Sequence, residues 1–499
     1  MSNTSAVIDS NSPSSAGRAR SFRMAPLWVL LITVLAGLLR TLCLTSQGIT
    51  LDEGFSIFLG RTTYFNFVHL VWNSEFNMVL YYVLLRLWMN LGHSEFVIRM
   101  LGVLFATATV PVVYFLGKRL FDERTALLAA LLLAMHPSHL MLAQRARSYP
   151  LVILLVSMAS LCFVRALQKP TWVVWMAYAA FSAASVYSHF FAVLVIAAQM
   201  VSLLFILRRP PPWKLALPAL AFLAVLLLPM AAFFLHHGDT SHVAWVPDLT
   251  LQQVLWVLYS LTLSKGRSLA YIVAWGLAAW AAFRASSPDS RWPYQFTFTW
   301  MLVPPAVIIA ASLYQPLLVE RYLSICIPAS VLLAAAGIIQ LSRWTRAAAI
   351  GLLALILLYS ASGIRFYERH PEFAEGWRGA STYVLAHVQA GDVVIVGGLA
   401  GLSFDYYREI AKVGLPSFAR LESVATSLPS PPPQNVWLIG DTRFNPNWKG
   451  AVPGAGQAEV QGFAVAHQRD YCPLPTHAEM DGVRAWQFRR CISSSEPSQ

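Results

Sequence analysis

The sequence predicts a polytopic α-helical membrane protein with a small α/β domain at its C-terminus. Of the 499 residues, 57% are hydrophobic and only 12% are charged, and the mean hydropathy is +0.55. A soluble domain is about 25% charged, so a chain of this length with half that share could not cover its surface with polar groups. Lipid must therefore solvate much of the chain, and α-helices are one of the two structures that satisfy the backbone in lipid.

Apolar runs long enough to cross a bilayer recur from residue 25 to residue 362. Since a spanning helix needs about 20 apolar residues, we expect about eleven membrane helices. They cover residues 25–44, 96–117, 126–142, 150–167, 172–188, 190–207, 214–235, 268–284, 294–313, 323–341 and 346–362. The first run follows a basic segment as a signal peptide would, but its length and the lack of a small-residue cleavage site favour an uncleaved helix.

Basic residues fall in alternate loops and so predict the orientation. One set of loops carries Arg18, Arg20, Arg23, Lys118, Arg119, Arg124, Arg165, Lys169, Arg208, Arg209, Lys214, Arg284, Arg291, Arg343 and Arg346. By the positive-inside rule, residues 1–24 form a cytoplasmic tail, residues 25–362 the membrane domain and residues 363–499 an extracytoplasmic domain. The net charge of +12 fits this bias. A nucleic-acid surface is disfavoured because the basic residues form no continuous tract.

The C-terminal segment has the composition of a soluble domain. Residues 377–389 predict a helix, and short apolar runs at 392–396, 435–439 and 485–488 predict strands of a small α/β domain. Cys472 and Cys491 lie in this domain. An oxidising outer location would permit a disulfide between them, whereas a reducing location would leave two free thiols. No cysteine spacing predicts a zinc site.

Two adjacent carboxylates stand near the start of the long first outer loop, residues 45–95. Asp52 and Glu53 follow the first predicted helix within residues 51–56, LDEGFS. Carboxylates at a membrane exit are costly unless they are solvated, paired or functional. They are candidates for general-base chemistry. The alternative is that Asp52 only caps a helix that begins near Glu53.

Two arginines run against the charge bias at the outer end of the third predicted helix, within residues 144–149, QRARSY. Arg145 and Arg147 lie on the side that is otherwise poor in basic residues, which suggests an anionic partner. A guanidinium group is suited to bidentate binding of phosphate. The alternative is that both side chains snorkel to the membrane interface.

Two further polar groups fall at outer helix ends. Glu320, Arg321 and Tyr322 begin a late helix, and His189 follows the end of another, where the alternative is an ordinary interface residue. All four polar groups lie on one side of the membrane under a single topology. Together they supply carboxylates that can accept a proton and arginines that can hold a phosphate.

In this order, these residues resemble the membrane glycosyltransferases related to protein O-mannosyltransferases. The similar stretches are LDEGFS at 51–56, LYYVLLRLW at 80–88, GHSEF at 92–96 with Arg99, GKRLF at 117–121, QRARSY at 144–149 and ERYL at 320–323 with Pro328. The resemblance extends over residues 25–365. Two departures are the stretch NMVL at 77–80, where many relatives carry a proline-containing pattern, and Arg145, where relatives carry an acid.

The resemblance implies the GT-C fold and an inverting transfer of a sugar, possibly mannose, from a polyprenyl-phosphate donor to an acceptor hydroxyl at the outer membrane face. Asp52 would be the catalytic base, with Glu53 as the second catalytic candidate. Arg147 and Arg321 match arginines expected near the lipid phosphate. The remaining expected substrate-binding residues are Gln144, Tyr149, Tyr322, Glu320, His189 and Tyr82.

The implied partners are a polyprenyl-phosphate-linked sugar, a protein, lipid or glycan acceptor, and membrane lipids, with no nucleic acid. The implied location is a bacterial inner membrane or a plasma membrane. No cofactor is required by the sequence, although Asp52 or Glu53 could hold a divalent cation.

Two other classes of protein compete with this hypothesis. A transporter or lipid flippase would more often show internal repeats and charges near the middle of the membrane. A non-catalytic sensor or scaffold would leave the loop carboxylates and the outer arginines unexplained. The discriminating observation is whether Asp52, Arg147 and Arg321 meet at one place on the outer side.

Overall fold

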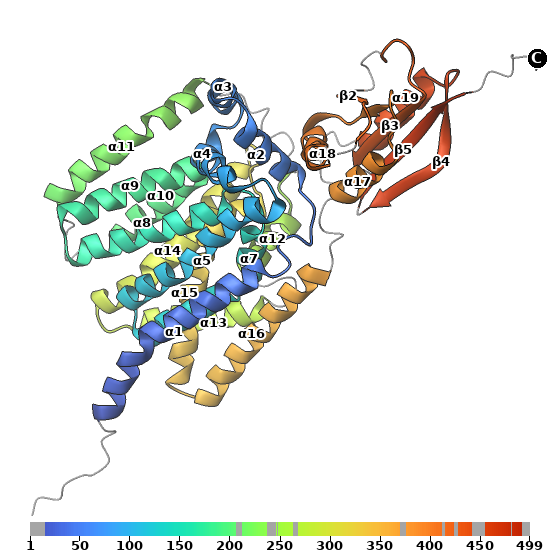
Figure 1. Cartoon of the computed structure of the whole chain (residues 1–499). Coiled ribbons are helices and arrows are strands. Elements are labelled where there is room, and N and C mark those ends of the chain that lie inside the picture. The colour runs from blue at the N-terminus through green and yellow to red at the C-terminus, as the bar shows by residue number, and fades with distance from the viewer. Residues whose placement is uncertain are drawn as a thin grey trace, which may run out of the picture.

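The computed structural model describes residues 15–205, 212–236, 246, 248–262, 268–369, 376–411, 415–423, 428–441, 455–480 and 482–491. Long helices form a bundle, and a sheet domain lies at one end of it (Figure 1). The bundle contains α1 (Ser15–Thr41), α5 (Glu95–Leu120), α6 (Glu123–Ala134), α7 (Pro137–Ala143), α8 (Tyr149–Gln168), α9 (Trp172–Ser188), α10 (Val193–Leu203), α11 (Trp213–His236), α12 (Leu251–Ser260), α13 (Leu269–Arg284), α14 (Pro288–Ser312), α15 (Ile327–Ser342) and α16 (Arg346–Arg369). The 3₁₀ segments η3 (Phe190–Ala192) and η5 (Glu320–Cys326) precede α10 and α15.

Within the described residues, 7 segments are long and apolar enough to cross a membrane: α1, α5, α8, α11, α14, η5 with α15, and α16. The bent pair α6–α7 brings the number to 8. The helices α9, α10 and α13 coincide with further predicted runs but are shorter. A polytopic helical membrane domain is thus confirmed, whereas eleven crossings stays a prediction.

The apolar run at 126–142 forms two helices, although the sequence predicted one. α6 and α7 are bent by 56° across the break between them. Pro137 has no amide hydrogen and its ring clashes with the preceding turn, so it begins a new helix. Arg40 of α1 donates to the carbonyls of Leu133 and Ala134 at 3.1 and 3.0 Å. This buried arginine therefore satisfies carbonyls at the end of α6.

The first outer loop folds into short helices at the end of the bundle next to the sheet domain (Figure 1). They are α2 (Leu51–Arg61), α3 (Tyr64–Ser74) and α4 (Val79–Trp88), with the 3₁₀ turns η1 (Phe76–Met78) and η2 (Met89–Leu91). A capping box begins α2: the Thr50 side chain accepts from the backbone N–H of Glu53, and the Glu53 carboxylate accepts from the N–H of Thr50. The cap determines where the helix starts and therefore where the first-turn residue Asp52 lies.

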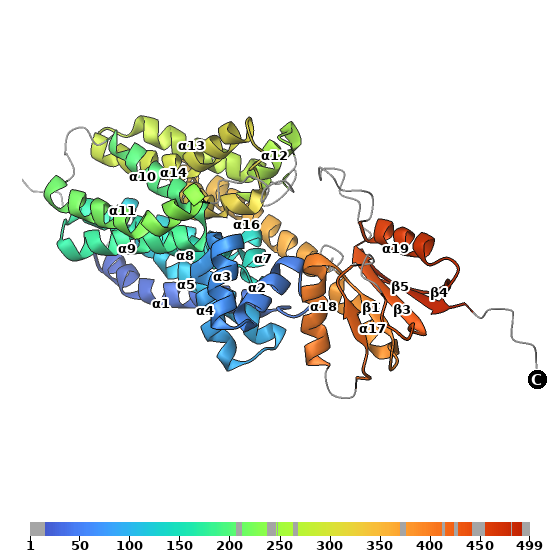
Figure 2. The same cartoon turned by 90° about the horizontal axis from the view of Figure 1, so that it is seen from above.

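The C-terminal domain contains a five-stranded mixed sheet with helices on both faces (Figure 2). Its elements are α17 (Trp377–His387), β1 (Val393–Ile395), α18 (Gly398–Ile410), β2 (Ala419–Leu421), β3 (Asn435–Asp441), α19 (Ala455–Ala466), β4 (Tyr471–Met480) and β5 (Val483–Arg490). The order is β2-β1-β3-β5-β4, with β1 parallel to β2 and β3, and β5 antiparallel to β3 and β4. Val394 and Trp437 belong to the core shared with α17 and α18, whereas Val393 and Leu438 pack with Phe463 of α19. Burial of both faces explains why these strands are apolar runs.

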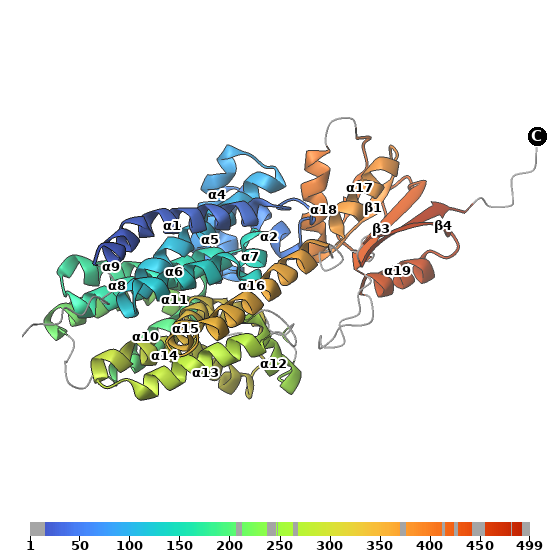
Figure 3. The ribbon, with the colours of Figure 1, turned by 90° about the horizontal axis from the view of Figure 1, so that it is seen from below.

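The C-terminal domain docks on the first outer loop, where α18 lies against α2 (Figure 3). The Tyr407 hydroxyl accepts from the N–H of Ile49 at 2.7 Å, and the Ser403 hydroxyl donates to the carbonyl of Thr50 at 3.2 Å. The approach is close, because a Cβ atom on Gly54 would lie 3.0 Å from the backbone nitrogen of Ser403. The domain therefore contacts the backbone that leads into α2.

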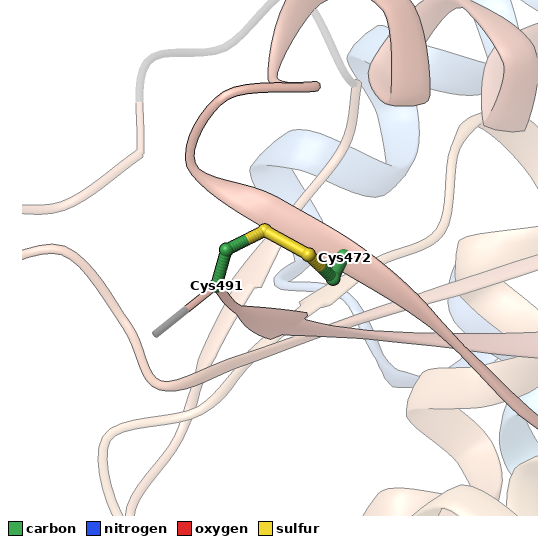
Figure 4. The surroundings of a disulfide bond; sticks show 2 residues. All are labelled: Cys472 and Cys491. Carbon is green, nitrogen blue, oxygen red and sulfur yellow. A yellow bond between two sulfur atoms is a disulfide. The ribbon is translucent and has the colours of Figure 1, made fainter. Parts of the chain in front are cut away.

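Cys472 and Cys491 form a disulfide, with their Cα atoms 5.3 Å apart (Figure 4). Cys472 lies near the start of β4 and Cys491 directly follows β5, so the bond ties the open ends of this hairpin. The predicted pairing is confirmed. It fits the predicted extracytoplasmic location of the domain, because disulfides persist in oxidising compartments.

Candidate active site

Three residues from distant parts of the chain meet at the end of the bundle that faces the C-terminal domain. Asp52 lies in the first turn of α2, Arg147 between α7 and α8, and Arg321 in η5. The Oδ2 atom of Asp52 is 3.3 Å from Nη1 of Arg321. Nη1 of Arg147 is 3.4 Å from both the carbonyl oxygen of Asp52 and the hydroxyl of Tyr82. One carboxylate and two guanidinium groups thus share one site.

Asp52 keeps its negative charge in this site. Its side chain is 33% exposed and that of Arg321 is 31% exposed, so both can reach a ligand. Burial alone would raise the pKa of Asp52, but Arg147, Arg321 and Arg145 lower it below its usual range. The carboxylate is therefore ionised at neutral pH, as a proton acceptor must be.

Glu53, the neighbouring carboxylate, is fully buried and surrounded by donors. Its Oε1 accepts from Arg99 Nε at 2.8 Å and from the N–H of Ala146 at 2.9 Å. Its Oε2 accepts from Arg99 Nη2 at 2.8 Å and from the N–H of Thr50 at 3.0 Å. Burial opposes ionisation, but Arg99 and these hydrogen bonds lower the pKa of Glu53. Both oxygen atoms are engaged inside the protein, which suits a group that positions α2 rather than one that meets a substrate.

Arg99 connects Glu53 to the chain that enters α2. Besides the carboxylate, it donates to the carbonyls of Leu44, Gln47 and Gly48 at 3.0, 2.8 and 2.7 Å. Sequence reasoning had assigned this residue no role in the site. The available signal was a lone arginine in the first turns of an apolar helix, because a charge in that position needs a partner.

The loop at residues 144–148 presents Arg147 to the site. Gln144, expected to bind substrate, donates its amide to the carbonyls of Arg40 and Leu42 at 3.1 and 2.7 Å. The amide of Gln144 thus holds the chain's own backbone. Glu53 holds the same loop at Ala146, so two side chains determine where the guanidinium of Arg147 lies.

Four buried polar atoms beside this loop have no hydrogen-bond partner among the described residues. They are Nε of Arg147, the hydroxyls of Ser148 and Tyr149, and Nε2 of His189. Buried polar groups are normally hydrogen-bonded, so a set of them in one place marks where a polar ligand can bind. The ring of His189 lies 5.9 Å from that of Tyr149, so these two side chains are neighbours, and Arg147 and Ser148 directly precede Tyr149 in the chain.

His189 presents a neutral donor. Its Nδ1 accepts from the N–H of Phe191 at 3.4 Å, which leaves the proton on Nε2. Burial lowers the pKa of His189 to about 3, and Arg147 and Arg321 act in the same direction. The ring packs 4.9 Å from that of Tyr322. At neutral pH this side chain can donate to an oxygen atom of a ligand but carries no charge.

Every residue predicted for the site lies at this end of the bundle, but the structure gives them different surroundings. Tyr82 is fully buried next to Arg147, whereas Glu320 is exposed at the start of η5. Within the described part of the chain, no group of three or more His, Cys, Asp or Glu side chains could hold a metal ion. The possible divalent cation stays a hypothesis.

The architecture is the GT-C fold of polytopic membrane glycosyltransferases. ArnT from Cupriavidus metallidurans bound to undecaprenyl phosphate matches with a TM-score of 0.59 and 11% identity, covering 95% of this chain and 99% of that one. The apo state of the same protein matches with a TM-score of 0.60 and 12% identity, covering 93% and 98%. The arabinofuranosyltransferase AftD from Mycobacteria matches with a TM-score of 0.50 and 13% identity, covering 92% of this chain and 41% of that one. At such identities the likeness concerns the fold.

Within that fold, residues 78–236 match the family of the dolichyl-phosphate-mannose-protein mannosyltransferases. The matched segment contains Tyr82, Arg147 and His189, and it lies between Asp52 and Arg321. No curated protein sequence matches the chain. The resemblance to GT-C membrane glycosyltransferases is confirmed by the family match and by the fold together.

Proposed function

We propose that this protein is an inverting glycosyltransferase that moves a sugar from a polyprenyl-phosphate donor to an acceptor hydroxyl at the outer membrane face. The observation that carries the proposal is the meeting of an ionised carboxylate, Asp52, with the guanidinium groups of Arg147 and Arg321. A transporter or scaffold requires no such meeting of a base with two phosphate-binding groups.

In the proposed reaction Asp52 is the general base. It takes the proton of the acceptor hydroxyl as the acceptor oxygen forms a bond to the anomeric carbon. The bond between that carbon and the phosphate oxygen breaks on the opposite side, which inverts the configuration. The electron pair of the broken bond leaves with the polyprenyl phosphate.

Arg147 and Arg321 are proposed to stabilise the leaving group. A lipid phosphate needs no general acid, but it needs positive charge where negative charge grows. The two guanidinium groups flank Asp52. A phosphate between them would share their field, and the pKa of Asp52 would then rise toward that of an ordinary carboxyl, which makes it a better base.

The polar atoms of Ser148, Tyr149 and His189 are proposed to bind the sugar. Sugar hydroxyls both donate and accept, so they can pair with hydroxyl groups and with the N–H of a neutral imidazole. The rings of Tyr149, His189 and Tyr322 supply apolar faces in the same place. Mannose is the candidate that the matched family suggests, and the acceptor can be a protein, a lipid or a glycan.

The test is direct transfer by the purified protein in lipid, offered a panel of polyprenyl-phosphate sugars together with protein, lipid and glycan acceptors, with released polyprenyl phosphate as the product. Wild type should release it from at least one donor, and Asp52→Asn should lower that rate by about 10²–10⁴-fold. Asp289→Asn is a matched control, because Asp289 lies in the first turn of α14, on the predicted cytoplasmic side and away from the candidate site. Its rate should equal that of wild type. Binding of donor with no release by wild type, or equal rates for wild type and Asp52→Asn, would contradict the proposal.

A further inference from the structure

A large apolar groove lies between α1, α6, α15 and α16, away from the candidate active site. Its volume is about 790 Å³, and its walls include Ile32, Leu128, Leu131 and Ile338. Sites for small ligands typically measure about 300–1,000 Å³, so the groove has room for a sizeable apolar group. Trp28 and Ile350 at its border are 53% and 67% exposed.

The groove and the active site lie at opposite ends of the membrane domain. Arg321 begins the helical path through η5 and α15, and Arg343 follows its end. At a rise of 1.5 Å per residue, the two arginines are roughly 30 Å apart along the path, which is about the thickness of a bilayer core. The groove therefore opens beside the basic loops, on the predicted cytoplasmic side.

Three arginines stand at this end of the groove. Arg124, Arg343 and Arg346 line it and are exposed. Arg343 donates to the side chain of Gln340 at 3.1 Å, but none of the three forms an ion pair with a carboxylate of the described chain. Lys118 on the same side differs, because it pairs with Glu123 at 2.7 Å. An apolar groove that ends in three unneutralised guanidinium groups is complementary to a molecule with a long apolar chain and an anionic head.

We propose that this groove is a binding site for an anionic phospholipid of the leaflet on this side of the membrane. An acyl chain would lie against the leucine and isoleucine walls, and the phosphate would lie among Arg124, Arg343 and Arg346. Arginine binds phosphate through paired N–H donors, and a basic residue near the membrane surface contributes about a factor of five in affinity for an anionic lipid. A neutral phospholipid would gain the apolar contacts but less from the arginines.

The experiment measures lipid binding by the full-length protein in detergent, using native mass spectrometry and phosphatidylglycerol or phosphatidylcholine with identical acyl chains. Wild type should retain phosphatidylglycerol in preference to phosphatidylcholine. The triple variant R124Q/R343Q/R346Q should bind phosphatidylglycerol on the order of a hundredfold more weakly, from three factors of about five. Leu131→Trp, which fills the groove, should weaken binding without any change of charge.

The matched control is R165Q/K169Q/K214Q, which removes three exposed positive charges from the same side but outside the groove. Its affinity for phosphatidylglycerol should stay that of wild type. Equal loss in the control and groove variants would show only general surface attraction and would overturn the site. Equal binding of the two phospholipids would also contradict the proposal. So would displacement of bound phosphatidylglycerol by undecaprenyl phosphate at a lower concentration than phosphatidylglycerol itself needs to bind, because the groove would then prefer the polyprenyl lipid.

Discussion

Neutralising Glu53 should mainly lower the stability of the protein, whereas neutralising the adjacent Asp52 should mainly lower its rate of transfer. Glu53→Gln removes the carboxylate that pairs with Arg99 at 2.8 Å, where the side chains of Glu53 and Arg99 are 0% and 2% exposed, and leaves Arg99 only the longer 3.7 Å contact with Glu95. Breaking a buried ion pair by removing one partner costs about 3–5 kcal/mol, because the other charge stays buried. Asp52→Asn instead disrupts an ion pair with Arg321 in which both side chains are about one-third exposed. Such pairs contribute about 0–1 kcal/mol to stability.

We therefore expect Glu53→Gln to lower the midpoint of thermal unfolding by about 5 °C or more, and Asp52→Asn to leave it nearly unchanged. The rates should show the reverse order, with the larger loss in Asp52→Asn. Unfolding is measured in the same detergent for all variants. Turnover is measured at a temperature below the unfolding midpoint of the least stable variant. A stable Glu53→Gln protein without turnover, next to an active Asp52→Asn protein, would refute both assignments at once.

Arg321→Gln should move the acid limb of kcat/KM to higher pH. Asp52 is ionised at pH values above its depressed pKa, and activity is lost as the pH falls through that pKa. Arg321 is one of the groups that lower the pKa of Asp52, so removing its charge should raise that pKa. An acid limb that does not move would exclude Asp52 as the titrating base. Arg147→Lys should weaken donor binding more than stability, because it loses the planar fork; unchanged donor affinity would contradict this. Gly54→Ala should lower stability or turnover through a clash with the docked domain, whereas Gly276→Ala, with open space for a Cβ atom, should not. A reporter fused to the C-terminus should lie outside, and a cytoplasmic signal would reverse the topology.

The membrane fold was predictable because lipid imposes one rule on every span. An apolar run of sufficient length must be helical, so run lengths alone locate the helices. The break before Pro137 was not predicted, although a proline at the first helical position is the local signal for a helix start. The sequence does carry an interruption at that point, because the polar stretch HPSH at 136–139 separates two apolar halves of the run.

The residues of the candidate site were predicted from residue types placed against the charge bias, as with Arg147, and from the family resemblance. What the sequence could not separate were the roles of neighbours. Asp52 and Glu53 are adjacent acids, and only their surroundings distinguish an accessible carboxylate from one engaged by Arg99. Pairings such as Tyr407 with Ile49 also escape sequence reasoning, because a hydroxyl on a soluble helix does not indicate which distant backbone it contacts.

The contact of α18 with the start of α2 has a consequence for biosynthesis. Ser403 and Thr50 are 353 positions apart, and Tyr407 and Ile49 are 358 positions apart. The segment that carries Asp52 leaves the ribosome early, but the surface that receives it is made only when most of the chain has been synthesised. Contacts between such distant residues can form only after the second partner has been made, and they must offset the entropy of closing the intervening chain. A truncated or partly inserted chain would therefore present Asp52 without the contacts of the C-terminal domain that hold the start of α2.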